Sequence, residues 1–103
     1  MSSPEKMLTL SNIEGWINYK LKRYYSMPTI EVVRLGIKEH KKLGCELYYV
    51  DIKYKGLVKT VHADAAFLNA SESPALYLVA ECMPFARGLI RFKEQKEQEE
   101  HDV

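Results

Sequence analysis

The feature that most constrains this chain is a pair of strand-forming segments separated by one short turn. Cys45–Tyr54 and Leu57–His62 are rich in Tyr, Val and Ile, and Lys55-Gly56 lies between them. A two-residue turn places Val50 opposite Val61 and sorts the side chains onto two faces. The apolar face collects Tyr48, Val50, Ile52, Tyr54, Leu57, Val61 and Ala63, with Lys59 as its one polar member. This sorting predicts an antiparallel hairpin whose apolar face is buried against other elements.

Two helices are predicted before the hairpin. The first spans 11–25, because Ser11 and Glu14 have the spacing of a capping box. Its apolar face is formed by Ile13, Trp16, Ile17, Leu21 and Tyr24. Gly15 near its start indicates either close packing or a weak first turn. The second helix runs from Thr29, as N-cap, to Gly44, and its buried stripe consists of Ile30, Val33 and Ile37.

The C-terminal half is predicted to contain a third strand and a last helix. Residues 63–70 form one or two helical turns, and the strand Ala75–Cys82 is apolar on both alternations. Pro84 ends that strand, and a helix covers residues 85–98. The alternative for 87–92 is a further strand followed by a charged tail.

These elements predict an α+β domain of two layers. A three-stranded antiparallel sheet, made of the hairpin and the third strand, packs with two N-terminal helices and a C-terminal helix. The 103 residues form one domain at 11–93, preceded by an arm at 1–10 and followed by an acidic tail at 94–103. Residues 1–93 hold 14 Lys and Arg against 9 Asp and Glu, whereas the tail holds one Lys against five acids.

Composition excludes several classes of protein. Hydrophobic residues make up 47% and charged residues 28%, which excludes disorder over most of the chain. The longest apolar run, 75–80, is far shorter than the roughly 20 residues of a membrane-spanning helix. Two cysteines are too few for a disulfide scaffold, and the N-terminus has no apolar signal segment. We therefore expect a cytoplasmic protein without a membrane partner.

No known catalytic or phosphate-binding motif occurs, so we expect no enzyme, no cofactor and no metal site. The potential zinc ligands Cys45, Cys82, His40 and His62 are too irregularly spaced for a zinc site. Glu81, at the end of the predicted strand, and His62 are the side chains that a ligand pocket would use.

The candidate interaction residues are cations interleaved with tyrosines. The first group, at the end of the first helix, is Tyr19, Lys20, Lys22, Arg23 and Tyr25, and the second is Lys38, Lys41 and Lys42. If the ends of the two predicted helices lie together, these groups form one basic surface.

We expect a small protein that acts by protein–protein contact, as an adaptor, inhibitor or regulator, and that forms a homodimer. Seven Tyr, three Phe and one Trp exceed what one small core can bury. The predicted strand at 75–82 is apolar on both faces, and a second chain or a partner is needed to cover one of them. In a protein contact, Tyr19 and Tyr25 should matter more than the neighbouring cations.

The alternative is a nucleic-acid-binding module that uses residues 19–25. Lys and Arg neutralise phosphates, and tyrosines stack on unpaired bases. The predicted order of strands and final helix is similar to the α-β-β-β-α order of double-stranded RNA-binding domains. The lysine-rich start of their last helix is missing, because residues 83–87 contain one cation, Arg87.

The acidic tail should be dispensable for folding. Deleting Glu97–Val103 removes mostly solvated side chains, so the free energy of unfolding should change by no more than about 0.5 kcal/mol. Thermal unfolding followed by circular dichroism measures the change. A large fall in melting temperature would instead show that the tail docks on the basic body.

Overall fold

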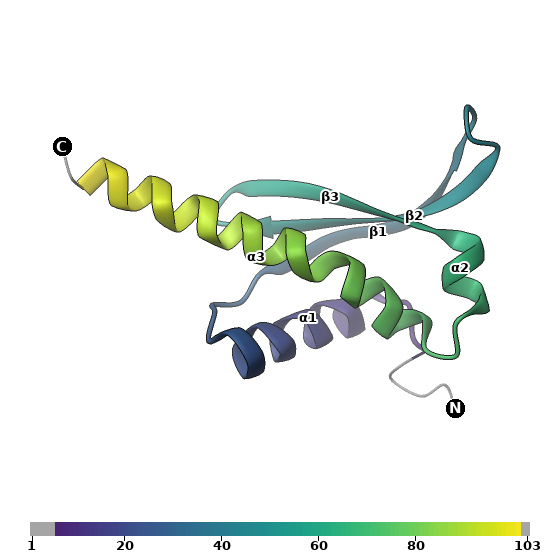
Figure 1. Ribbon diagram of the computed structural model, residues 1–103, viewed down its shortest axis with the longest axis horizontal. Helices are drawn as coiled ribbons and strands as arrows, with labels where there is room; N and C mark the ends of the chain where they lie inside the picture. Colours follow the sequence, from purple (N-terminus) through teal and green to yellow (C-terminus); the bar gives the residue numbers. More distant parts are fainter. Residues whose placement is uncertain (1–5, 102–103) are drawn as a thin grey trace.

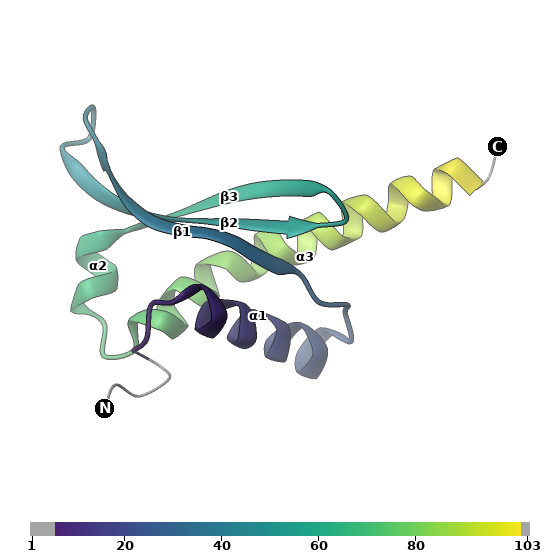
Figure 2. The ribbon, with the colours of Figure 1, turned by 180° about the vertical axis from the view of Figure 1, so that it is seen from behind.

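The computed structural model describes residues 6–101 and shows the predicted two-layer α+β architecture. Its elements are α1 (Leu10–Tyr25), β1 (Glu31–His40), β2 (Cys45–Tyr54), β3 (Leu57–Asp64), α2 (Ala65–Ala70) and α3 (Pro74–His101). The strands form an antiparallel sheet in the order β1-β2-β3. α1 and α3 lie on the same face of this sheet and leave the other face open (Figures 1 and 2).

The hairpin of β2 and β3 has the predicted register. Val50 pairs with Val61 and Tyr54 with Leu57. Both turn residues between them have positive φ, 47° at Lys55 and 84° at Gly56. Two consecutive left-handed residues give the turn a twist that matches that of the strands. The face sorting read from the sequence is thereby confirmed.

The segment 29–44 forms β1 and a turn, so the predicted second helix is wrong. β1 pairs antiparallel with β2 and supplies the third strand of the sheet. Val33 and Ile37, which a helix would bury, are exposed, whereas Ile30 and Val32 are buried. β-branched residues pack well on a pleated surface, and here this preference outweighs the apparent helical spacing.

α1 begins one residue earlier than predicted. Thr9 is the N-cap, and its hydroxyl oxygen accepts the backbone N–H of Asn12 at 3.3 Å. The capping box of Ser11 and Glu14 is therefore wrong, because Ser11 already lies inside the first turn. Ile13, Ile17 and Leu21 are fully buried, as predicted.

Three hydrogen bonds join α1 to the start of β1. The Asn18 side chain donates to the carbonyl of Ile30 at 3.0 Å and accepts its N–H at 2.8 Å. The Glu14 carboxylate accepts the N–H of Val32 at 2.9 Å. These contacts satisfy backbone groups at the edge of the sheet and fix where β1 crosses α1.

α3 replaces the predicted strand at 75–82. One helix runs through Pro84 to His101, so the alternative strand at 87–92 is wrong as well. Ala80, whose carbonyl loses its donor at Pro84, is exposed, and water can satisfy it there. Glu81 is consequently an exposed helix residue and not the end of a buried strand.

The two layers meet in one apolar core. Fully buried side chains come from α1 (Ile13, Ile17, Leu21), from the sheet (Val50, Ile52) and from α3 (Leu78, Val79, Cys82, Ile90). Each large side chain contributes about 1.5–3 kcal/mol on burial. Within residues 6–99, the part of the chain whose burial is described, this core holds no buried polar or charged residue. The contact between the sheet and the helices is therefore mainly apolar, and the α1–β1 hydrogen bonds and an exposed ion pair between Lys55 and Glu97, at 3.1 Å, add to it.

The two free thiols should differ in reactivity. Cys45 on β2 is half-buried, whereas Cys82 is fully buried in α3. Burial, with a smaller effect of Glu81, raises the pKa of Cys82 to about 12, which keeps it protonated and inert. We expect one thiol of the native protein to react with Ellman's reagent and the second only in denaturant. Rapid reaction of native Cys45→Ser protein would contradict this placement of Cys82.

Candidate interaction surfaces

The predicted cluster at the end of α1 is accessible to solvent. Tyr19 is 52% exposed, and Lys22 and Arg23 are exposed beside it, whereas Lys20 is half-buried. Tyr24, expected in the core, is 65% exposed, which corrects that prediction. Tyr24 is on the same side of the helix as Ile13 and Leu21, but it lies in the last turn of α1, beyond Leu21, the last buried residue of that helix.

Aromatic rings continue this cluster along α1. The Tyr19 ring makes edge-to-face contacts with Trp16, at a centroid distance of 6.0 Å, and with Tyr24, at 6.4 Å. A Cβ at Gly15 would meet no atom within 4 Å, so Gly15 does not allow a close approach of other elements. The exposed side of α1 is thus a row of aromatic rings with cations at its C-terminal end.

Tyr25 has a structural role in addition to its exposure. The Arg87 guanidinium of α3 lies 4.2 Å from the centre of the Tyr25 ring. Arg87 Nη1 also donates to Tyr25 Oη at 3.4 Å. Tyr25 therefore ties the end of α1 to α3, and its replacement would affect this packing as well as any partner contact.

The second group of predicted cations is distant from the first. Lys38 belongs to β1, and Lys41 and Lys42 to the turn after it. That turn and the C-terminal end of α1 lie at opposite ends of the molecule (Figures 1 and 2). The expected single basic surface does not form, because residues 29–44 are a strand that carries these lysines away from α1.

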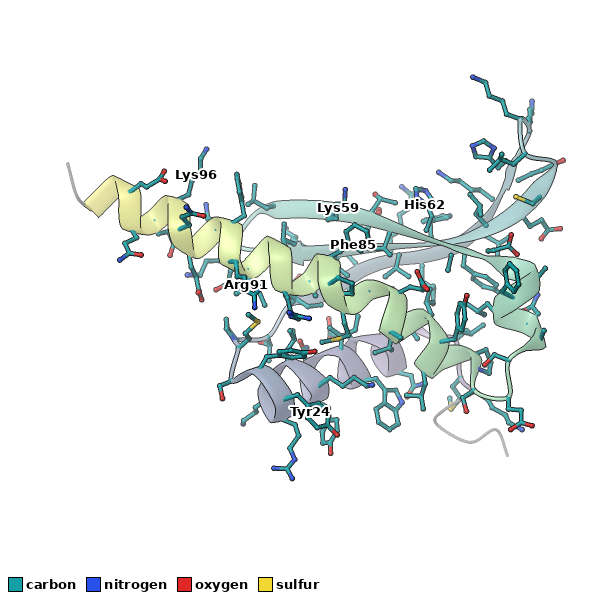
Figure 3. The ribbon with its side chains drawn as sticks, viewed as in Figure 1. Tyr24, Lys59, His62, Phe85, Arg91 and Lys96 are labelled. Carbon is teal, nitrogen blue, oxygen red and sulfur yellow. The ribbon has the colours of Figure 1, made fainter. Side chains whose placement is uncertain are left out.

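An exposed stripe on α3 was missed by the sequence analysis. Phe85 is 43% and Phe92 53% exposed, and Leu89 is half-buried between them. Lys59 Nζ lies 5.3 Å from the Phe85 ring centre, and Lys96 Nζ lies 5.7 Å from that of Phe92. Figure 3 shows Phe85 on α3 beside Lys59 of β3.

The centre of this stripe is open. Gly88 and Leu89 line a hollow of 250 Å³ with the two phenylalanines. A Cβ at Gly88 would meet nothing within 4 Å. The sequence signal was the helical spacing of Phe85, Leu89 and Phe92, which predicts a helix but does not tell an exposed side from a buried one. The core face is formed by Ala86 and Ile90 instead.

A third surface lies on the open side of the sheet. Val50 and Ile52 point to the helices, so Tyr49 and Asp51 face the open side. Gly36 is opposite Tyr49, and a Cβ at Gly36 would lie 2.5 Å from Tyr49 Oη. The hydroxyl end of the Tyr49 ring therefore packs against Gly36, in the space that a Cβ would occupy.

Polar groups surround this ring. Arg34 Cζ and Lys38 Nζ lie 5.7 and 5.9 Å from its centre. Asp51 accepts the hydroxyl of Thr60, and His62 is the β3 partner of Tyr49. A hollow of 330 Å³ is lined by Arg34, Ile37, Lys38, Tyr49, Asp51 and Thr60.

The electrostatics of the open face are positive. Burial and the charge of Lys38 lower the pKa of His62 below its ordinary value, and Asp51 opposes this effect. His62 is therefore neutral at pH 7, and the permanent charges beside Tyr49 are Arg34, Lys38 and Asp51. An anion that reaches this surface meets two cations and one carboxylate.

Among residues 6–99, whose side chains the structure describes, no three His, Cys, Asp or Glu side chains converge to hold a metal ion. The described helices also include none with the length and hydropathy of a membrane span.

Comparison with family models, curated proteins and solved structures found no match. Apart from the short α2, the helix–three strands–helix order is similar to that of double-stranded RNA-binding domains, but residues 74–80 at the start of α3 contain no cation. Element order alone carries no function.

Proposed function

We propose that this protein acts by protein–protein contact and forms a homodimer through the α3 stripe, defined as Glu81, Phe85, Gly88, Leu89, Phe92 and Lys96. The observation that carries the proposal is that this stripe is complementary to a second copy of itself. A two-fold dimer requires this property, because each patch must fit its own copy.

The match is clearest for the apolar residues. If two α3 helices pack antiparallel around an axis between Gly88 and Leu89, Leu89 of one copy faces Gly88 of the other. Leu89 then enters the open space above the glycine. By the same symmetry Phe85 faces Phe92 of the second copy, so both exposed rings become covered. Aromatic pairs of this kind add about 0.5–1.5 kcal/mol beyond the area they bury.

The charges at the ends of the stripe also match. The same axis brings Glu81 of one copy opposite Lys96 of the other, and both side chains are exposed in the single chain. From Glu81 to Lys96 the stripe is about 22 Å long at the rise of an α-helix. The antiparallel arrangement gives two such ion pairs, whereas a parallel one would place like residues together.

The remaining surfaces stay accessible in this dimer. The α1 cluster and the open sheet face are not part of the stripe, so both are available to further partners. Contact through Tyr19 and Tyr25 stays a prediction for the α1 cluster, as does the alternative that Lys20, Lys22 and Arg23 bind nucleic acid. The two-chain unit is suited to an adaptor, inhibitor or regulator that presents each surface twice.

Gly88→Glu tests the dimer without weakening the fold. The new side chain meets open space in the single chain and replaces the poor helix former glycine, which favours the helix by up to about 1 kcal/mol. At the dimer axis it places two carboxylates together. Light scattering should give about twice 11.9 kDa for the native chain and one chain mass for Gly88→Glu.

Gly15→Glu is the matched control, because Gly15 is the other exposed helical glycine with no atom near its Cβ position. It should remain dimeric. Glu81→Lys and Lys96→Glu should each weaken the dimer, and the two changes together should restore it. A native monomer at high concentration, or a dimer that Gly88→Glu leaves intact, would refute the α3 interface.

A further inference from the structure

The open face of the sheet has the components of a site for a stacked, anionic ligand. Its centre is the Tyr49 ring, whose hydroxyl end packs against Gly36. Tyr49 belongs to the side of the sheet that the helices do not cover. An aromatic ring in this position resembles a platform on which a second planar group can stack.

Two cations flank the platform along β1. Arg34 and Lys38 lie two residues before and two after Gly36, so they share its face of the strand and are about 13 Å apart at their Cα atoms. Their charged groups lie over the ring, 5.7 Å (Arg34 Cζ) and 5.9 Å (Lys38 Nζ) from its centre. Lys41 and Lys42 extend the positive charge into the turn beyond β1.

The far side of the platform offers hydrogen-bonding groups. Thr60 and Asp51 line the same hollow as Tyr49, and the Asp51 carboxylate is an acceptor. A carboxylate repels phosphate but accepts hydrogen bonds from the amino groups of bases. The hollow thus combines cations for the phosphates of a nucleic acid, an aromatic ring for one of its bases and an acceptor for the edge of that base.

We propose that the open sheet face, centred on Tyr49, Arg34 and Lys38, binds single-stranded nucleic acid. One base stacks on Tyr49, and the neighbouring phosphates contact Arg34 and Lys38. Stacking on an aromatic platform beside cations gives single-strand binding with little sequence preference. A duplex fits less well because its bases are already stacked on each other. An acidic peptide would use the cations but not the ring.

The site is independent of the proposed dimer. Arg34, Lys38 and Tyr49 belong to β1 and β2, on the side of the sheet that α3 does not cover (Figure 2). Changes to these residues should leave the mass in light scattering unchanged. Failure of the dimer and failure of nucleic-acid binding are therefore distinguishable.

The test is fluorescence anisotropy with labelled dT and U oligonucleotides of about 12 nucleotides, a length within the usual range of single-strand sites. We expect binding that weakens as salt rises from about 50 to about 200 mM. Tyr49→Leu should weaken binding about fivefold or more, and Tyr49→Phe should retain it because the ring is kept. Circular dichroism shows whether each variant is folded.

The charge test uses two matched double variants. Arg34→Glu with Lys38→Glu should weaken binding at least about tenfold and flatten the salt dependence. Lys22→Glu with Arg23→Glu changes the net charge equally on the α1 cluster and should have little effect. The opposite result would overturn the proposal and place the site on α1.

Three other results would also overturn it. The first is no binding of either oligonucleotide at low salt. The second is that a duplex of the same length binds more tightly than the single strands. The third is that polyglutamate binds as tightly as the oligonucleotides and that Tyr49→Leu does not weaken its binding. Polyglutamate binding of that kind would identify a surface for acidic proteins.

Discussion

The apolar face of the sheet is the constraint on which the rest of this structure depends. Three strands turn Val32, Val50, Ile52 and Val61 to one side, and two helices must cover them. α1 packs beneath β1, where Asn18 and Glu14 bind its backbone, and α3 runs beneath β3. Around the stripe, the core takes up the other side of α3 through Ala86 and Ile90. The stripe from Glu81 to Lys96 on another side of this helix is left without a cover.

The hairpin could be predicted because its turn and its alternation agree. Lys55-Gly56 permits a two-residue turn, and only one register sorts the faces. The prediction was wrong for two segments. Residues 29–44 were predicted as a helix but form β1 and a turn, and residues 75–82 were predicted as a strand but belong to α3. Val32 and Val33 favour a strand, and Ala75, Leu76 and Leu78 favour a helix, so intrinsic propensity pointed the right way in both. In the prediction, the capping residues Thr29 and Gly44 and the proline at 84 were given more weight than this propensity. Tertiary packing, which the sequence does not display, decided both.

The candidate surfaces could be predicted only as residue types. The cations and tyrosines of residues 19–25 are exposed as a cluster, but the fold carries Lys38, Lys41 and Lys42 to the other end of the sheet. Tyr49 gave no signal in the sequence, since its importance comes from packing against Gly36 of a neighbouring strand. Phe85 and Phe92 are at helical spacing, yet spacing alone does not tell a core face from an exposed one. That distinction depends on which side of α3 the sheet covers.

The central claim is that two α3 helices pair antiparallel, and spin-label distances between the two copies test it most directly. Nitroxides at Arg91→Cys and at Gln98→Cys, each with Cys45→Ser, lie on the same exposed flank of α3 beside the stripe. An axis between Gly88 and Leu89 separates the two labels along the helix by about 8 Å at position 91 and about 28 Å at position 98. The account predicts a clearly longer distance at position 98 than at position 91. Equal distances, or no dipolar coupling at either position, would contradict it.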